Sequence, residues 1–271
     1  MTPAYLAEVS ERDATGTVAA IYAEIRQVLD VPVVNLIYRH LAADERRLEA
    51  TWAAVRPALA HPATRGLAAS LARTAEEVRP HVESIDREAA LLGGIAATDM
   101  QRARATFTVY ERANALNLLA ARALAHGAPG VEAERHVASA RPVPDAEILP
   151  MADLGGLDEH THGRLVALSR AVTAPGDDVL IPSLYRHLAS VPLLFQLIAE
   201  ATEAALARKA LAAAGAAVRR QAQELALRLP LRVEPTTDVS VRAVVERFEP
   251  AIASMLVAGR VLDAVLAPAS R

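Results

Sequence analysis

One five-residue sequence, Tyr-Arg-His-Leu-Ala, occurs twice in this chain of 271 residues, at 38–42 and at 185–189. Each copy follows a short apolar run that contains a proline, and each precedes a segment whose apolar residues recur at helical spacing. Internal repetition constrains a fold more strongly than any local pattern. We therefore predict two copies of one helical unit that face each other across the two pentapeptides.

The composition favours an all-α protein. Hydrophobic residues make up 52% of the chain and charged residues 23%, which is enough apolar material for a substantial core. Aromatic residues are only 3%, so the core must rely on Leu, Val, Ile and the strong helix former Ala. No alternating pattern typical of strands is present. The predicted fold class is all-α, with two tandem helical repeats related by a pseudo-twofold axis.

Prolines and glycines divide the chain into three parts. We predict a first helical repeat with an N-terminal arm at 1–127, a connector at 128–158 and a second helical repeat at 159–271. The connector is rich in Pro and Gly and lacks a regular period, so we expect it to wrap over the surface.

Apolar periodicity predicts the helices within each repeat. A long apolar stripe from Val34 to Leu59 indicates one helical face, and a second long helix is expected from Val191 to about Gly215. A last helix, from about Ser240 to Leu266, contains Pro250. The other expected helices are at about 15–31, 63–79, 82–92, 98–127, 159–173 and 216–228.

Several classes of protein are excluded. The net charge is −3 with both signs interspersed, and no basic stripe is present, so no nucleic-acid partner is expected. The absence of cysteine excludes disulfides and thiolate chemistry. The start of the chain lacks the features of a signal peptide, and no apolar run reaches the roughly 18 residues of a membrane span. We expect a soluble, cytoplasmic protein without a membrane partner.

The search for cofactor and metal motifs is negative. The chain has no His-Glu-x-x-His sequence, phosphate loop, nucleophile elbow or dinucleotide fingerprint, so no cofactor is predicted. His160 and His162 lie two residues apart, so they point different ways on a helix, and no metal site is predicted there. His40 and His187 lie inside the pentapeptides; such histidines are usually structural, and catalysis is the alternative.

Asn114 is the stronger candidate for a functional residue. It lies on an apolar helical stripe with Phe107, Tyr110, Leu118 and Ala121. A buried carboxamide needs partners, because an unpaired polar group costs about 1–3 kcal/mol. It therefore either bonds to a neighbouring helix or lines a pocket and orients a polar ligand, and the spacing leaves both interpretations open.

Short stretches at 3–5, 21–26, 31–34, 41–42, 149–153 and 188–192, together with Asn114, are scattered over nearly the whole chain. Through them the sequence resembles the group I 2-haloacid dehalogenases. That family is all-α, built of two tandem repeats with the active site between them, and forms homodimers. The resemblance implies hydrolysis of a small 2-halocarboxylic acid without a cofactor, with water activated by an aspartate and placed by an asparagine.

Matched position by position, the resemblance assigns the water-placing asparagine to Asn114. The serine that precedes the family's aspartate corresponds to Ser183, and bulky pocket residues correspond to Val33 and Leu36, which are smaller here. Tyr38 and Tyr185 are expected as further polar residues of the substrate pocket.

The catalytic aspartate itself corresponds to Leu184, which is a departure from the family. Leu184 also lies on an apolar stripe, which is typical of a core residue. Leucine cannot accept a proton, and general-base help is typically worth about 10²–10⁴-fold, so attack by neutral water should be feeble. Glu111, Asp177 and Asp178 are the alternative bases, although each is more typical of a surface or loop charge.

Two functions follow. The first is a hydrolase that acts on a small 2-substituted carboxylic acid by direct water attack, which the leucine at position 184 argues against. The alternative is a non-catalytic homologue, either a small-acid-binding protein or a structural dimer. Both predict a homodimer.

Overall fold

The computed structural model describes residues 5–132, 147–173 and 178–267. Within these ranges the chain forms eleven α-helices and one 3-10 helix, and no β-strand beyond two isolated bridges. The predicted all-α class is therefore confirmed. Among the described helices, none combines the length and apolar character that a bilayer span requires.

Six helices precede the connector. The last of them, α6, is long and is buried on nearly all sides. The six are α1 (Gly16–Leu29), α2 (Leu36–Leu41), α3 (Glu45–Ala60), α4 (Pro62–Val78), α5 (Arg87–Leu92) and α6 (Ala97–His126).

Five α-helices follow the connector, and their order of lengths resembles that of the first series without α5. After the 3-10 turn η1 (Leu154–Gly156) come α7 (Glu159–Val172), α8 (Ser183–Ala189), α9 (Pro192–Ala201), α10 (Arg208–Ala226) and α11 (Val239–Val265). The connector expected at 128–158 includes 133–146, which lie outside the described residues.

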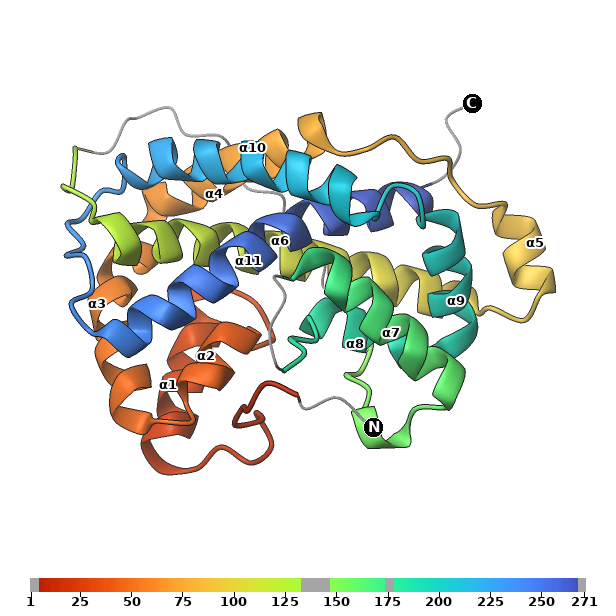
Figure 1. Cartoon of the computed structure of the whole chain (residues 1–271), viewed down its shortest axis with the longest axis horizontal. Coiled ribbons are helices and arrows are strands. Elements are labelled where there is room, and N and C mark those ends of the chain that lie inside the picture. Colours follow the sequence, from red (N-terminus) through yellow and green to blue (C-terminus); the bar gives the residue numbers. More distant parts are fainter. Residues whose placement is uncertain (1–4, 133–146, 174–177, 268–271) are drawn as a thin grey trace.

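The two long helices α6 and α11 pack against each other through the middle of the molecule (Figure 1). The groups α1–α3 and α7–α9 lie towards opposite ends of this pair, while α4 and α10 cover it. Both central helices are apolar around most of their circumference, as expected for helices enclosed by others.

Polar residues of the central pair are ion-paired across the halves. Arg260 of α11 bonds to Glu76 of α4 and Glu111 of α6. Arg122 of α6 bonds to Glu249 of α11 and Gln223 of α10. The long helices α6 and α11 therefore make reciprocal contacts, each through one arginine.

Two helix predictions are corrected. The stripe from Val34 to Leu59 is divided between α2 and α3, because the turn after Leu41 ends one helix and the Asp44 carboxylate caps the next by accepting from the Arg47 N–H. The apolar residues of both helices still pack into one core. Periodicity alone does not reveal the break.

The helix expected from Val191 to Gly215 instead ends at Ala201, and α10 runs through Gly215 to Ala226. Gly215 lies mid-helix because α10 approaches α11 closely there. A Cβ at this glycine would lie 3.0 Å from the Ser254 Oγ. The residue therefore reflects packing between helices rather than a helix end.

Candidate ligand-binding site

A small cavity lies between the two helix groups, where the starts of α2 and α8 meet α6 and α11. Its volume of about 40 Å³ has room for roughly three water molecules. Such a space suits a ligand of a few non-hydrogen atoms. Its lining comprises Asn35, Leu36, Ile37, Tyr110, Asn114, Leu180, Pro182, Ser183, Leu184, Phe248, Ala251, Ile252 and Met255.

The cavity brings together four residues singled out in the sequence: Leu36, Asn114, Ser183 and Leu184. They come from three helices, α2, α6 and α8. Leu184 is 1% exposed to solvent and lies in van der Waals range of Gly259, where an added Cβ would be 3.8 Å from its Cδ2. The aliphatic side chain of Leu184 and the candidate water-placing residue Asn114 thus line the same cavity.

The other three predicted pocket residues lie elsewhere. Val33 lines a separate surface cleft of about 890 Å³ between the N-terminal arm and the connector. Tyr38 and Tyr185 are fully buried but do not line the cavity; the Tyr38 hydroxyl donates to the Asn117 Oδ1 at 2.9 Å. The structure therefore places none of these three at the cavity wall.

Asn35 is a cavity residue that the sequence reasoning missed. It lies just before α2, and its Nδ2 donates to the Asn114 Oδ1 at 3.1 Å. Both asparagines are 6% exposed. The available signal was a polar residue in the apolar run 31–37, at the position where a helix cap is expected.

Tyr110 and His187 form a second buried polar pair beside the cavity. The His187 Nδ1 lies 2.5 Å from the Leu149 carbonyl oxygen, which can only accept, so Nδ1 carries the proton. Nε2 therefore accepts from the Tyr110 hydroxyl at 3.1 Å. Burial lowers the pKa of His187 to about 4 and raises the pKa of Tyr110 to about 12, so both are neutral near pH 7.

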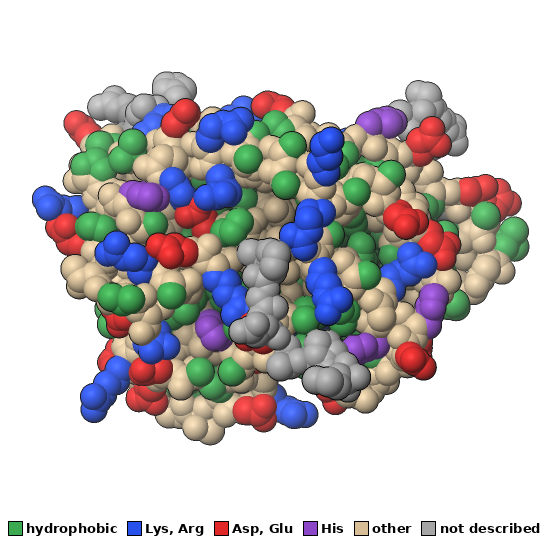
Figure 2. All heavy atoms as spheres, viewed as in Figure 1, with side chains coloured by type: hydrophobic (Ala, Val, Ile, Leu, Met, Phe, Trp, Pro, Cys, Tyr) green, Lys and Arg blue, Asp and Glu red, His purple; other side chains and the backbone are tan. Residues whose placement is uncertain are grey.

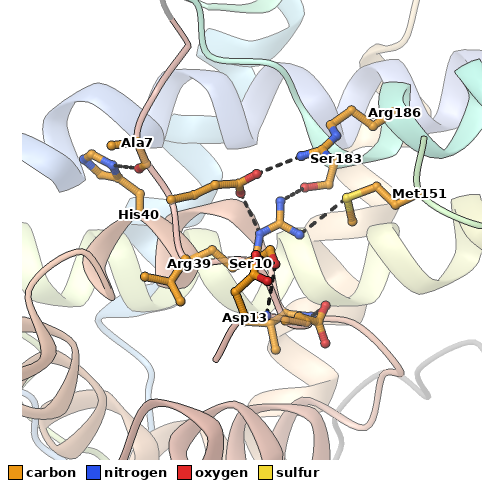
Figure 3. Close-up of polar contacts among 12 residues, drawn as sticks. Ala7, Ser10, Asp13, Arg39, His40, Met151, Ser183 and Arg186 are labelled. Atoms are coloured by element: carbon orange, nitrogen blue, oxygen red, sulfur yellow. Dashed lines mark hydrogen bonds and ion pairs between the residues drawn. The ribbon is translucent and has the colours of Figure 1, made fainter. Parts of the chain in front are cut away.

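A charged cluster lies behind Ser183 (Figure 3). The Arg39 guanidinium, 2% exposed, donates to the Ser183 Oγ at 2.8 Å and to the Glu8 carboxylate at 2.8 Å. The same carboxylate accepts from Arg186 at 2.7 Å. Two cations share one anion, so the cluster carries a net charge of about +1 next to the cavity. The two arginines are equivalent members of the repeated pentapeptides.

No carboxylate lines the cavity among the described residues. Glu111 is ion-paired with Arg260. Asp178 is ion-paired with Arg247, and the hydrogen bond from Arg247 lowers the pKa of its carboxyl. Asp177 lies outside the described residues. The two described alternative bases are thus engaged with arginines away from the lining.

The histidine pair 160 and 162 makes no cluster with other ligands. Among the described residues, no group of three or more His, Cys, Asp or Glu side chains could hold a metal ion. The His162 Nε2 contacts the Tyr5 hydroxyl instead.

Acidic and basic side chains are interspersed over the face of the molecule drawn in Figure 2.

The fold and cavity define an all-α protein with a small, mostly apolar site between two helix groups. Over almost the whole chain this architecture matches solved structures of D-2-haloacid dehalogenase. A mutant enzyme and a complex with L-LA both match with a TM-score of 0.77, and a mutant complex with D-2-CPA matches with 0.75. Each match covers 98% of this chain and 96% of the other, at 15% sequence identity. The all-α fold implied by the sequence resemblance is confirmed.

Sequence comparison alone is much more limited. No protein-family model matches the chain. A 55-residue segment is 38% identical to the (R)-2-haloacid dehalogenase of Pseudomonas putida. That segment is 20% of this chain and spans only 18% of the length of that relative. Over the whole length of the chain, the similarity is therefore one of three-dimensional fold.

Proposed function

We propose that this chain is a divergent member of the group I 2-haloacid dehalogenase family that binds a small 2-substituted carboxylic acid and hydrolyses it feebly at most. The observation that carries the proposal is the shared cavity of Asn114 and Leu184. The family's water-placing residue is retained there, while the position of the base is aliphatic. Water in such a cavity keeps its protons, so direct displacement of halide lacks its general base.

The electrostatics of the site support an acid as the ligand. Asn114 and Ser183 provide neutral hydrogen-bonding groups at the cavity wall, and the net positive cluster of Arg39, Glu8 and Arg186 lies directly behind Ser183. A buried carboxylate needs such hydrogen bonds and a nearby cation. The cavity volume restricts the acid to a few carbon atoms.

The duplicated architecture is part of the proposal. The order α1, α2, α3, α4, α6 parallels the order α7 to α11, and the Arg260 and Arg122 contacts are reciprocal. These features support repeats at 1–127 and 159–271 joined by a connector at 128–158, with the ligand on the pseudo-twofold axis. We further propose that the chain forms a homodimer in the cytoplasm.

The segment that leads into each repeat adds independent support. The Val9 N–H donates to the Arg39 carbonyl, and the Ala152 N–H donates to the Arg186 carbonyl. Likewise, His40 bonds to the Ala7 carbonyl and His187 to that of Leu149. These similar contacts support the proposal that the end of the connector packs on the second repeat as the N-terminal arm packs on the first.

Halide release and ligand binding test the proposal together. With the wild-type chain, calorimetry should detect binding of 2-chloropropionate, while chloride release from both enantiomers should stay near the uncatalysed rate. Leu184→Asp should then raise chloride release by about 10²-fold or more, because it supplies the missing base.

Leu184→Asn is the matched control, since it is nearly the same size and polar but cannot act as a base. Rapid chloride release by the wild-type chain would contradict the assignment of a feeble hydrolase. Absence of any binding would contradict the small-acid function.

A further inference from the structure

The two asparagines of the cavity are arranged with a definite polarity. The Nδ2 of Asn35 donates to the Oδ1 of Asn114, so the oxygen of Asn114 is already engaged. No described residue accepts a hydrogen bond from the Asn114 Nδ2, and Asn114 lines the cavity. The group that Asn114 offers to a molecule in the cavity is therefore an N–H donor.

This arrangement leaves an unpaired acceptor behind it. The Asn35 Oδ1 is sealed from solvent and has no hydrogen-bond partner among the described residues. An unpaired buried carbonyl is unfavourable by about 1–3 kcal/mol. Stability does not explain why this unpaired group lies beside a ligand cavity, so we look for its explanation in ligand binding.

The polarity has a chemical consequence. Water that attacks carbon must give up a proton, so a residue that assists it accepts hydrogen bonds from it. An N–H donor can place the water, but it engages one of the two lone pairs and so lowers the nucleophilicity of the water. Both oxygens of a carboxylate accept hydrogen bonds, whereas a primary amide has one accepting oxygen and one donating NH₂ group, so a carboxylate fits the donor in either orientation.

We propose that Asn35 is a positioning residue that holds Asn114 as a hydrogen-bond donor and thereby selects carboxylates over neutral amides in this cavity. The inference rests on the proposed small-acid function and adds the residue that sets ligand specificity. The Ser183 Oγ accepts from Arg39, so its own O–H is left as a donor. The Tyr110 hydroxyl donates to His187, so only its oxygen lone pairs are left and it adds no donor for a carboxylate.

Binding of a matched pair of probes tests the selection. Propionate and propionamide have nearly the same shape, but only the amide can also donate a hydrogen bond. The wild-type chain should bind propionate at least tenfold more tightly. In Asn35→Leu the Asn114 carboxamide is free to turn its oxygen to the cavity, so the preference for propionate should fall threefold or more.

Tyr38→Phe is the control. It removes a hydrogen bond from α2 to Asn117, one turn from Asn114 on α6 but outside the cavity lining. Its preference for propionate should remain within twofold of the wild-type value. If Asn35→Leu weakens both probes equally and keeps the wild-type preference, Asn35 is merely structural and the inference is wrong.

A ligand-free measurement separates this inference from the proposed function. Scalar coupling across the hydrogen bond, measured by NMR, should connect the Asn35 Nδ2 to the Asn114 Cγ. Coupling from the Asn114 Nδ2 to the Asn35 Cγ, or none in either direction, would overturn the positioning role. Failure of the wild-type chain to bind either probe would instead refute the small-acid function, and the coupling alone would then decide the role of Asn35.

Discussion

Tyr38 and Tyr185 hold the same position in the two copies of the pentapeptide, but within the described part of the chain only Tyr38 has a partner for its hydroxyl. The Tyr38 hydroxyl donates to Asn117 of α6 at 2.9 Å. The Tyr185 hydroxyl is sealed from solvent without a partner among the described residues. If α6 and α11 are aligned on Arg122 and Arg260, the position of Asn117 corresponds to Met255. A thioether is a weak acceptor at best.

The two tyrosines should therefore respond in opposite ways to loss of the hydroxyl. Tyr38→Phe should lower the free energy of unfolding by about 1–2 kcal/mol, since it leaves the Asn117 Oδ1 unpaired. Tyr185→Phe should raise it by up to about 1 kcal/mol, because an unsatisfied buried group is removed. Urea unfolding of both variants measures the difference, and equal losses would contradict the assignment.

Glu8 should contribute far more than a surface ion pair. Glu8→Gln leaves Arg39 and Arg186 next to each other without their shared anion, and Arg39 is buried. We expect a loss of about 2–4 kcal/mol in the free energy of unfolding. The control is Glu234→Gln, which breaks the exposed pair with Arg232 and should cost less than about 1 kcal/mol. Similar losses in both variants would contradict a special stabilising role for the cluster of Glu8, Arg39 and Arg186.

His187 should make stability depend on pH in the mildly acidic range. Its folded pKa of about 4 lies below the usual value of 6.5, so the unfolded chain binds the proton first. Stability should therefore fall as the pH decreases from about 6.5 towards 4, by on the order of 3 kcal/mol from this group. In His187→Gln, the free energy of unfolding should depend less steeply on pH across this range, because the contribution of His187 is removed. An unchanged slope would show that His187 titrates normally.

Two helical glycines should differ in their tolerance of a side chain. Gly215→Val should destabilise the protein by about 1–3 kcal/mol, because even a Cβ would lie 3.0 Å from the Ser254 Oγ. A Cβ at Gly163 of α7 would have nothing within 4 Å, so Gly163→Ala should stabilise by about 0.5–1 kcal/mol through helix propensity. Thermal unfolding distinguishes the two, and a stabilised Gly215→Val would contradict the close approach of α10 and α11.

The local pattern of apolar residues along the sequence was sufficient to predict much of the fold. The helix expected at about 98–127 agrees with α6 (Ala97–His126) to within a residue at each end, because a long periodic segment leaves few alternatives. The break between α2 and α3 and the end of α9 were missed, since both depend on how helices pack rather than on their own periodicity. Asn35 was missed because an isolated polar residue before a helix is usually only a cap.

The helical class, the duplicated pentapeptide and the aliphatic residue at position 184 follow from the amino-acid sequence, because these are properties of local spacing and side-chain type. What each copy of the pentapeptide does depends instead on the packed molecule. His40 stacks on Phe248, whereas His187 bonds to Tyr110 in the interior. The physical reason is that identical segments form identical turns of helix, but the helix that each one faces carries different side chains, and those neighbours set burial, hydrogen bonding and charge.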